Sequence, residues 1–314
     1  MINLRYHIVS LVAVFLALGM GILVGTTVID RVTVEALSAK LDDVRGSVGA
    51  IEGQNRQLAD QVKIGRDFAD QARDLAVRGV LKDVPVLVMA VAGVDRKPVD
   101  VLAHGLATAG AVNQGTLWFT SKMRLAAPGD IAGFAAAVNL SPEIPEVPDS
   151  LRALALGRLS EPGPTAALVA GGFATYEPPP ASAGGTPSST TTIPPLSGVP
   201  VAGTRFVVVS GAGATVGDDL LALPLAQSLG RGANRVVAVE SGQDSPGGRA
   251  VFIGPLRSDP RAGASLSTVD NLESPMGQVA TVLALEQLAA AQVGHFGVGP
   301  GSQRLLPPVS PAGH

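Results

Sequence analysis

One uncharged apolar run near the N-terminus constrains this chain more than any other feature. No charged residue occurs between Arg5 and Asp30, and the run from Ile8 to Ile29 is almost wholly apolar. A helix needs roughly 20 such residues to cross the hydrocarbon core of a bilayer. We therefore predict an uncleaved signal-anchor, with residues 1–30 forming the N-terminal membrane anchor. A cleaved signal peptide is the alternative, but no A-x-A-like cleavage site follows the run.

The orientation of this anchor follows from what comes after it. Arg5 precedes the run and Arg31, Lys40 and Arg45 follow it, so a count of positive charges does not favour a cytoplasmic N-terminus. Long C-terminal domains, however, are translocated largely regardless of charge. We expect a single-pass membrane protein whose C-terminal domain lies outside the cytoplasm, in the cell envelope.

Two glycines in the run are spaced for helix packing. Gly21 and Gly25 form a G-x-x-x-G pair, which lets two helix backbones approach closely in lipid. We predict membrane-helix packing at Gly21 and Gly25, with the simple abundance of glycine in membrane helices as the alternative.

A heptad repeat follows the anchor directly. Its apolar positions alternate at gaps of three and four, and the "seam" that they form consists of Val34, Leu37, Leu41, Val44, Val48, Ile51, Asn55, Leu58 and Val62. This spacing is typical of a coiled coil, and a buried Asn at an a position such as Asn55 sets register in a parallel pair. We predict a coiled-coil stalk over residues 31–80 that self-associates.

The stalk also has weak points. Gly46, Gly49 and Gly53 each cost about 1 kcal/mol relative to Ala in a helix interior. After Val62 the repeat fades to Gly65, Ala69 and Ala72. The alternative is therefore a single amphipathic helix that lies on its own domain.

The rest of the chain predicts an α/β domain over residues 82–300. Val84 to Val91 is a continuous apolar, β-branched run, which is typical of a strand buried on both faces. Further strands are predicted at 117–120, 166–176, 204–209, 235–239, 250–253 and 265–269, and helices at 100–109, 131–138, 150–159, 218–228 and 277–291. This alternation favours a mainly parallel sheet with helices on both faces.

Two segments interrupt or follow that pattern. Residues 177–200 are rich in Pro, Ser and Thr, which predicts a solvated insertion within the α/β domain. Residues 301–314 are expected to form a flexible tail.

Composition excludes several kinds of site. The chain has no cysteine, so it has no disulfide, no thiolate metal ligand and no cysteine nucleophile. A formal net charge of −3 gives no reason to expect nucleic acid as a partner. Copper(I) prefers thiolate or thioether ligands, with imidazole next, and the five methionines are scattered along the chain. The residues themselves indicate no copper site and no cofactor.

Motifs for catalysis are equally sparse. Gly211-Ala-Gly213-Ala-Thr-Val-Gly217 follows a predicted strand, and Glu240 ends the next one, as a nucleotide site would require. The spacing is not that of the dinucleotide fingerprint, so we interpret it as a strand-to-helix turn, with nucleotide binding as the alternative. His295, in a glycine-flanked turn, is the histidine most worth testing. We expect no enzyme.

The two ends of the chain resemble the mycobacterial copper transport outer-membrane (MctB-like) family. At the N-terminus the resemblance rests on Ile2-Asn-Leu-Arg5-Tyr-His7 and Phe15-Leu-Ala-Leu-Gly-Met20-Gly. Near the C-terminus the matching residues are Ser267, Thr268, Val269 and Asp270, then Gly294, His295 and Gly297. The order of anchor, charged helix and α/β region is similar over nearly the whole chain.

This resemblance implies an actinobacterial envelope protein of copper efflux or homeostasis that forms pores in the outer membrane. It carries over no agreed catalytic or copper-ligating residue, so the metal ligands stay unknown. One helix alone cannot line a pore, and a channel would need oligomerised anchors. The alternative is a non-catalytic, membrane-anchored scaffold whose coiled stalk partners a cell-division protein of peptidoglycan remodelling.

Overall fold

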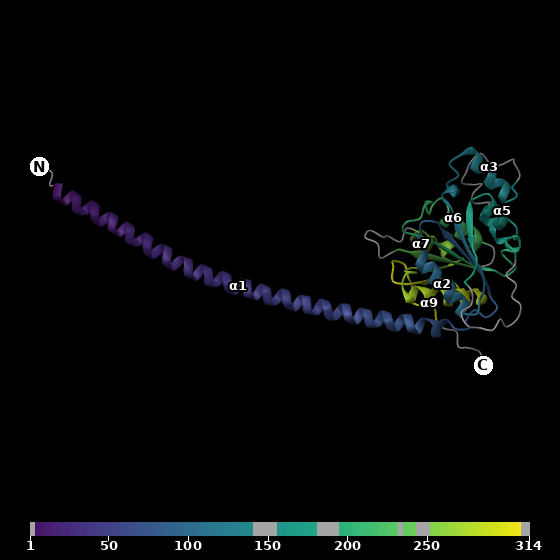
Figure 1. The fold of residues 1–314 in the computed structure, drawn as a ribbon, viewed down its shortest axis with the longest axis horizontal. Helices are drawn as coiled ribbons and strands as arrows, with labels where there is room; N and C mark the ends of the chain where they lie inside the picture. The colour runs from purple at the N-terminus through teal and green to yellow at the C-terminus, as the bar shows by residue number, and fades with distance from the viewer. Residues whose placement is uncertain (1–3, 141–155, 181–194, 232–234, 243–251, 309–314) are drawn as a thin grey trace. The chain divides into compact units, whose positions relative to one another are not determined.

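The computed structural model describes residues 4–140, 156–180, 195–231, 235–242 and 252–308 (Figure 1). The chain divides into two compact units, Met1–Arg66 and Asp67–His314, which we describe separately. We call the second the folded unit. It includes the last turns of the helix that the sequence predicts as stalk.

The first unit is helical throughout its described part. Helix α1 runs from Leu4 to Val77, and its part from Leu4 to Gly25 is long and apolar enough to cross a membrane. The predicted apolar N-terminal helix is therefore confirmed as a helix. Its length and composition suit a single-pass anchor and a signal sequence alike, so the anchor itself stays a prediction.

The seam side chains on α1 that the structure describes lie in solvent. The large apolar side chains of the seam from Leu37 to Val62 are all exposed, whereas the side chain of Val34 lies outside the described residues. Isolated α-helices gain most of their stability from packing an apolar face. The coiled coil therefore remains a prediction about how this face is covered.

The folded unit is built on one seven-stranded sheet of order β3-β2-β1-β4-β5-β6-β7. Its strands are β1 (Pro85–Val91), β2 (Val112–Phe119), β3 (Ala174–Glu177), β4 (Arg205–Gly211), β5 (Val236–Ser241), β6 (Ser267–Val269) and β7 (His295–Phe296). Every pairing is parallel except that of β2 with β3, which is antiparallel at one edge. The mainly parallel α/β sheet is confirmed.

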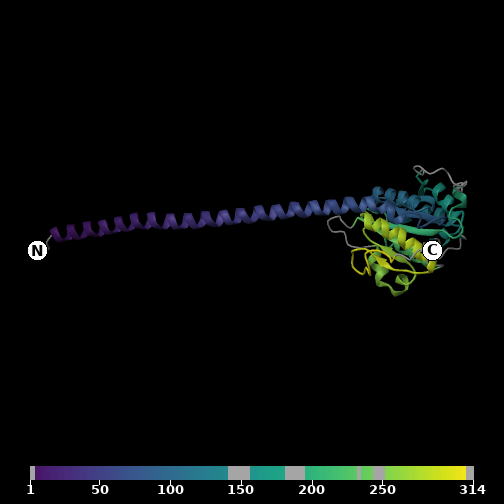
Figure 2. The same cartoon turned by 90° about the horizontal axis from the view of Figure 1, so that it is seen from below.

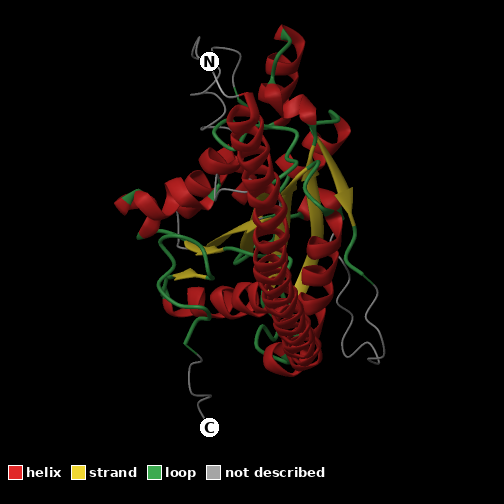
Figure 3. Ribbon diagram, turned by 90° about the vertical axis from the view of Figure 1, so that its left-hand side faces the viewer, coloured by secondary structure: helices red, strands yellow, loops and turns green. Residues whose placement is uncertain are grey.

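Helices cover both faces of the sheet, as Figure 3 shows with helices in red and strands in yellow. The α-helices of the folded unit are α2 (Arg96–Thr108), α3 (Pro128–Ala137), α5 (Pro164–Ala170), α6 (Ala222–Gly230), α7 (Ile253–Ser258), α8 (Pro260–Gly263) and α9 (Pro275–Gln287). Short 3-10 helices are η1 (Ser121–Arg124), η2 (Arg158–Ser160), η3 (Leu196–Gly198) and η4 (Leu288–Ala290).

Strand β1 explains why this arrangement forms. Val86 and Val88 pack into the core under α2 and α9, which lie side by side (Figures 1 and 2), while Leu87 and Met89 pack into the core under α3, α5, α6 and α7. Because successive side chains of a strand point to opposite faces, an apolar run without alternation must be covered on both sides.

Three predicted elements are corrected by the structure. Residues 166–176, predicted as a strand, form the end of α5 and then the short edge strand β3, because Pro164 starts a helix in an Ala-rich run. The strand predicted at 250–253 falls partly outside the described residues, and its last residue, Ile253, begins α7. The helix predicted from Asp218 begins only at Ala222.

Other boundaries differ because the local signal is weak. Strand β7, two residues long, is too short for periodicity to reveal it. Of the predicted helix 150–159, residues 150–155 lie outside the described residues and Arg158–Ser160 form η2. The Pro/Ser/Thr-rich tract lies between β3 and β4 of one sheet, and its residues 181–194 are not described. The first part of the predicted tail is hydrogen-bonded, since Gln303 N donates to His295 O across 2.7 Å.

Candidate functional site

The two C-terminal motifs come together at one edge of the sheet. Strand β6 pairs with β7 in parallel, so that Thr268 lies opposite His295 and Val269 opposite Phe296. The Gly294 amide donates to Ser267 Oγ across 3.2 Å. Residues 267–270 and 294–297 therefore form one site, although residues 271–293, which contain helix α9, separate them along the chain.

Asp270 lies at the centre of this site and is fully buried. Its Oδ1 accepts the Val298 amide at 2.8 Å, and its Oδ2 accepts the Gly299 amide at 2.9 Å. Gly297 brings the chain around the carboxylate with φ of 125°, and a Cβ there would lie 1.9 Å from Asp270 Oδ1. The carboxylate thus fixes the loop that follows β7. Glycine is required at position 297 because a side chain would collide with Asp270 and because the backbone has a positive φ.

Arg257 of α7 completes the site, and sequence reasoning missed it. Its Nη1 donates to Asp270 Oδ2 at 3.0 Å and to Pro300 O at 3.0 Å, and its Nη2 donates to Phe296 O at 2.8 Å. Burial lowers the pKa of the Arg257 guanidinium, which Asp270 opposes. No motif or spacing in the sequence marks Arg257, because its partners are distant along the chain. We call Arg257, Thr268, Asp270 and His295 the Arg257 cluster.

His295 packs into this cluster through its ring nitrogen Nδ1. Arg257 Nε donates to Thr268 Oγ1 across 2.8 Å, and the same hydroxyl forms a hydrogen bond with His295 Nδ1 at 3.0 Å. Burial lowers the pKa of His295, and the nearby Arg257 charge lowers it further. His295 as a whole is 8% exposed. Its geometry suits a structural role in the cluster better than that of a base or ligand open to solvent.

The cluster offers no place for a metal ion. The Asp270 oxygens accept two amides and a guanidinium, and His295 is the one imidazole of the cluster. Across the described residues, no group of three or more His, Cys, Asp or Glu side chains could hold a metal ion.

The glycine-rich turn after β4 lies at the point where parallel α/β sheets usually bind ligands. In such sheets the crevice opens where the strand order reverses, here between β1 and β4. Backbone fills this position: a Cβ on Gly213 would lie 2.6 Å from Gly93 O, and the Thr215 amide donates to Ala92 O at 2.7 Å. The exposed Arg124 Nε donates a hydrogen bond to the Thr215 carbonyl oxygen at 2.8 Å.

The other residues that a nucleotide site would use already contact other parts of the chain. A Cβ on Gly211 would lie 2.1 Å from Ser241 O, so this glycine allows two backbones to approach each other. Glu240 is buried and accepts the Phe252 amide at 3.2 Å. Asp218 accepts the Ser210 hydroxyl, and burial raises the pKa of its carboxyl group. The structure therefore supports the turn interpretation of residues 211–217.

A hollow of about 470 Å³ opens at the amino-terminal ends of the central strands β4 and β5, near the end of α6. Its lining consists of Gly157, Ser160, Val201, Ala202, Gly203, Thr204, Phe206, Ser228, Leu229, Arg231 and Arg235. Two guanidinium groups and no carboxylate line it, so its charge opposes a cation such as copper.

The predicted packing residues of the anchor and stalk stand apart from these sites. A Cβ added at Gly21 or Gly25 would meet no atom within 4 Å, and the seam side chains that the structure describes, Leu37 to Val62, are exposed. These residues could contact other molecules, and the single chain does not test that prediction.

Comparison with known proteins gives one consistent result. A family model described as "Copper transport outer membrane protein, MctB" matches residues 1–307. The copper transporter MctB of Mycobacterium tuberculosis is 24% identical over 96% of this chain and 98% of its own length. The copper transporter MctB of Mycobacterium leprae is 24% identical over 98% of this chain and 100% of its own length.

Proposed function

The chain belongs to the family of copper transport outer membrane proteins described as MctB, and we propose that it serves copper efflux or homeostasis in the cell envelope. The observation that carries this proposal is the match of the family model to residues 1–307, which includes the apolar helix and the folded unit together. Copper is the cargo in this proposal, and the names of the relatives point to transport rather than to catalysis.

The anchor limits how such a protein could work. One helix, Leu4–Gly25, is long and apolar enough to cross a membrane among the residues searched. A single helix has no lumen, so passage of an ion would require several copies around a shared path. We therefore propose oligomerisation as part of the function, with the N-terminus inside and the folded unit outside the cytoplasm.

Two features support self-association. The Gly21 and Gly25 surfaces leave room for a second helix in lipid, and the exposed seam presents apolar side chains at heptad spacing. Asn55 at an a position would favour one parallel register. The proposal thus assigns the anchor and the stalk to assembly and leaves the Arg257 cluster a structural role.

The test is copper accumulation in a strain that lacks the protein. Loss should raise cell-associated copper, and the full chain should restore the normal level. Leu58→Glu, which charges the seam, should fail to restore it, whereas Gln57→Glu, on the adjacent off-seam position, should succeed. Unchanged copper in the deletion strain would refute the proposal.

A second function is favoured by the same exposed seam. The stalk could bind a membrane protein of cell division and so act as a scaffold in peptidoglycan remodelling. Purification of the full chain from its own membrane distinguishes the two: a stoichiometric protein partner lost with Leu58→Glu, together with normal copper levels, would favour the scaffold.

A further inference from the structure

The last turns of α1 have two different sides in the folded unit. One side packs on the domain: Val77 is 1% exposed and joins the core under α2 and α9, and the Arg73 side chain is 23% exposed. Ala69 and Ala72 are half-buried. Of the small residues onto which the heptad repeat fades, Ala69 and Ala72 are thus partly covered, whereas Gly65 is exposed.

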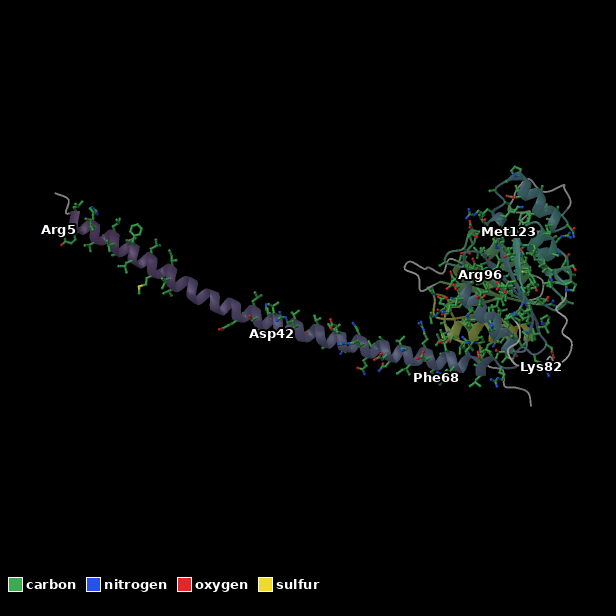
Figure 4. The ribbon with its side chains drawn as sticks, viewed as in Figure 1. Arg5, Asp42, Phe68, Lys82, Arg96 and Met123 are labelled. Atoms are coloured by element: carbon green, nitrogen blue, oxygen red, sulfur yellow. The ribbon has the colours of Figure 1, made fainter. Side chains whose placement is uncertain are left out.

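The other side carries two large apolar side chains in solvent. Phe68, labelled in Figure 4, is 72% exposed and Leu75 is 70% exposed. They are seven residues apart, so they lie on nearly the same side of the helix. Exposed apolar residues that share one side of a helix mark an interaction surface more often than singly scattered ones do.

Their spacing connects them to the seam. From Val62 the gaps to Gly65, Phe68, Ala72 and Leu75 are three, three, four and three residues. An extra step of three residues in a heptad repeat is a stammer, which locally overwinds a coiled coil. A seam that continues in this way exchanges the half-buried Ala69 for the exposed Phe68 and Leu75, and it keeps the half-buried Ala72 between them.

We infer that the stalk of a second copy of this chain packs along Phe68 and Leu75, so that pairing continues through a stammer as far as the folded unit. This inference rests on the self-association proposed above. In the shifted register both residues occupy d positions, where large apolar side chains favour parallel pairing. Val77 then falls at an f position, on the side opposite the partner, which agrees with its burial in the domain.

The charges around this surface fit a second copy better than a membrane. The flanking e and g positions carry Ala69, Gln71 and Ala76, so no like charges would meet across the pair. Asp67, Asp70 and Asp74 fall at c and f positions and stay in solvent. Surface-bound amphipathic helices are instead typically rich in Lys and Arg on the polar face.

Because the chain has no cysteine, disulfide trapping tests the inference directly. Single changes Ile51→Cys, Phe68→Cys and Leu75→Cys in the full-length protein, oxidised in its own membrane, should each give covalent dimers. A disulfide requires Cα atoms within roughly 4.4–6.8 Å, so Asp70→Cys and Asp74→Cys, on positions outside the seam, should stay monomeric.

The outcomes separate this inference from its premise. Dimers from Ile51→Cys together with none from Phe68→Cys and Leu75→Cys would overturn the shifted seam alone. Dimers from Ala69→Cys or Ala76→Cys in place of Phe68→Cys would show that the regular heptad persists. Failure of Ile51→Cys would overturn self-association itself. As a second measurement, Phe68→Ser should weaken self-association in detergent about tenfold or more, and Asp70→Ser should leave it unchanged.

Discussion

Arg257 Nη1 donates to Asp270 Oδ2 across 3.0 Å, with side chains 3% and 0% exposed. The pair links α7 to the end of β6, and through Gly299 and Pro300 it holds the loop after β7. Charges this deeply buried are tolerated because each is paired and hydrogen-bonded. Asp270, which belongs to the family-like motif of residues 267–270, therefore has a role in stabilising the fold.

Asp270→Asn should destabilise the folded unit strongly. Removing one partner of a buried ion pair leaves the other charge uncompensated, at a cost of about 3–5 kcal/mol. Urea unfolding of the folded unit measures this change. Asp130→Asn is the control, because the pair of Asp130 with Lys122 is partly exposed and should contribute less than about 1 kcal/mol. Equal losses for the two variants would contradict the central role of Asp270.

Gly297→Ala tests the close approach to the same carboxylate. The added Cβ would lie 1.9 Å from Asp270 Oδ1. The backbone at this position also has a φ of 125°, which residues other than glycine rarely adopt. Gly203→Ala is a matched control, since its φ is 81° and its Cβ would meet nothing within 4 Å. The control should lose about 1–2 kcal/mol from backbone conformation, and Gly297→Ala clearly more. Thermal unfolding of both variants provides the comparison.

Stability should fall on acidification because of His295. Burial and Arg257 lower its pKa in the folded protein below the ordinary 6.5, so the unfolded chain binds the proton first as pH falls. The contribution of the neutral ring is present above pH 6.5 and is lost as pH falls from there through the folded pKa. Urea unfolding between pH 7.5 and 5.5 should show this slope.

His295→Asn isolates that slope from other titrating groups. An amide can still pair with Thr268 but does not titrate, so the variant should lose stability less steeply over the same pH range. An identical slope in both proteins would mean that folding does not lower the pKa of His295.

Asn55→Leu should change the assembly rather than the fold. A buried Asn at an a position fixes register and number at a cost in stability, so Leu should tighten self-association while admitting other oligomers. Sedimentation of the full chain in detergent should show larger species than the parent protein. Gln57→Leu, off the seam, should leave the distribution unchanged. If the parent protein and both variants were monomers, the prediction that the stalk mediates assembly would be wrong.

The sequence predicted those parts of the fold in which burial itself creates a pattern. Val86 to Met89 had to be a two-sided strand, because no alternation separates their faces. Helix α5 was missed because seven residues between Gly163 and Gly171 are too few for a helical period to emerge from an apolar run. The alternation of elements alone thus indicated the sheet but not its edges.

Arg257 could not be predicted at all, for a different reason. Its role depends on partners at Thr268, Asp270 and Phe296 that come near only after β6 and β7 pair. A single arginine in a short helix carries no local signal. The motifs around Asp270 and His295 resemble those of a known family, and only the structure shows that they meet.

The last prediction concerns copper binding by residues 31–314, the chain without its N-terminal apolar segment. Residues 31–314 should form no tight stoichiometric copper complex, because the chain lacks cysteine and the described residues contain no metal-binding group of three or more His, Asp or Glu side chains. His295, the one imidazole beside Asp270, is buried against Thr268. Calorimetry with copper should therefore give no saturable binding. A one-to-one complex that disappears in His295→Ala but persists in His104→Ala would instead place a ligand in the Arg257 cluster, and it would require Thr268 to release the ring.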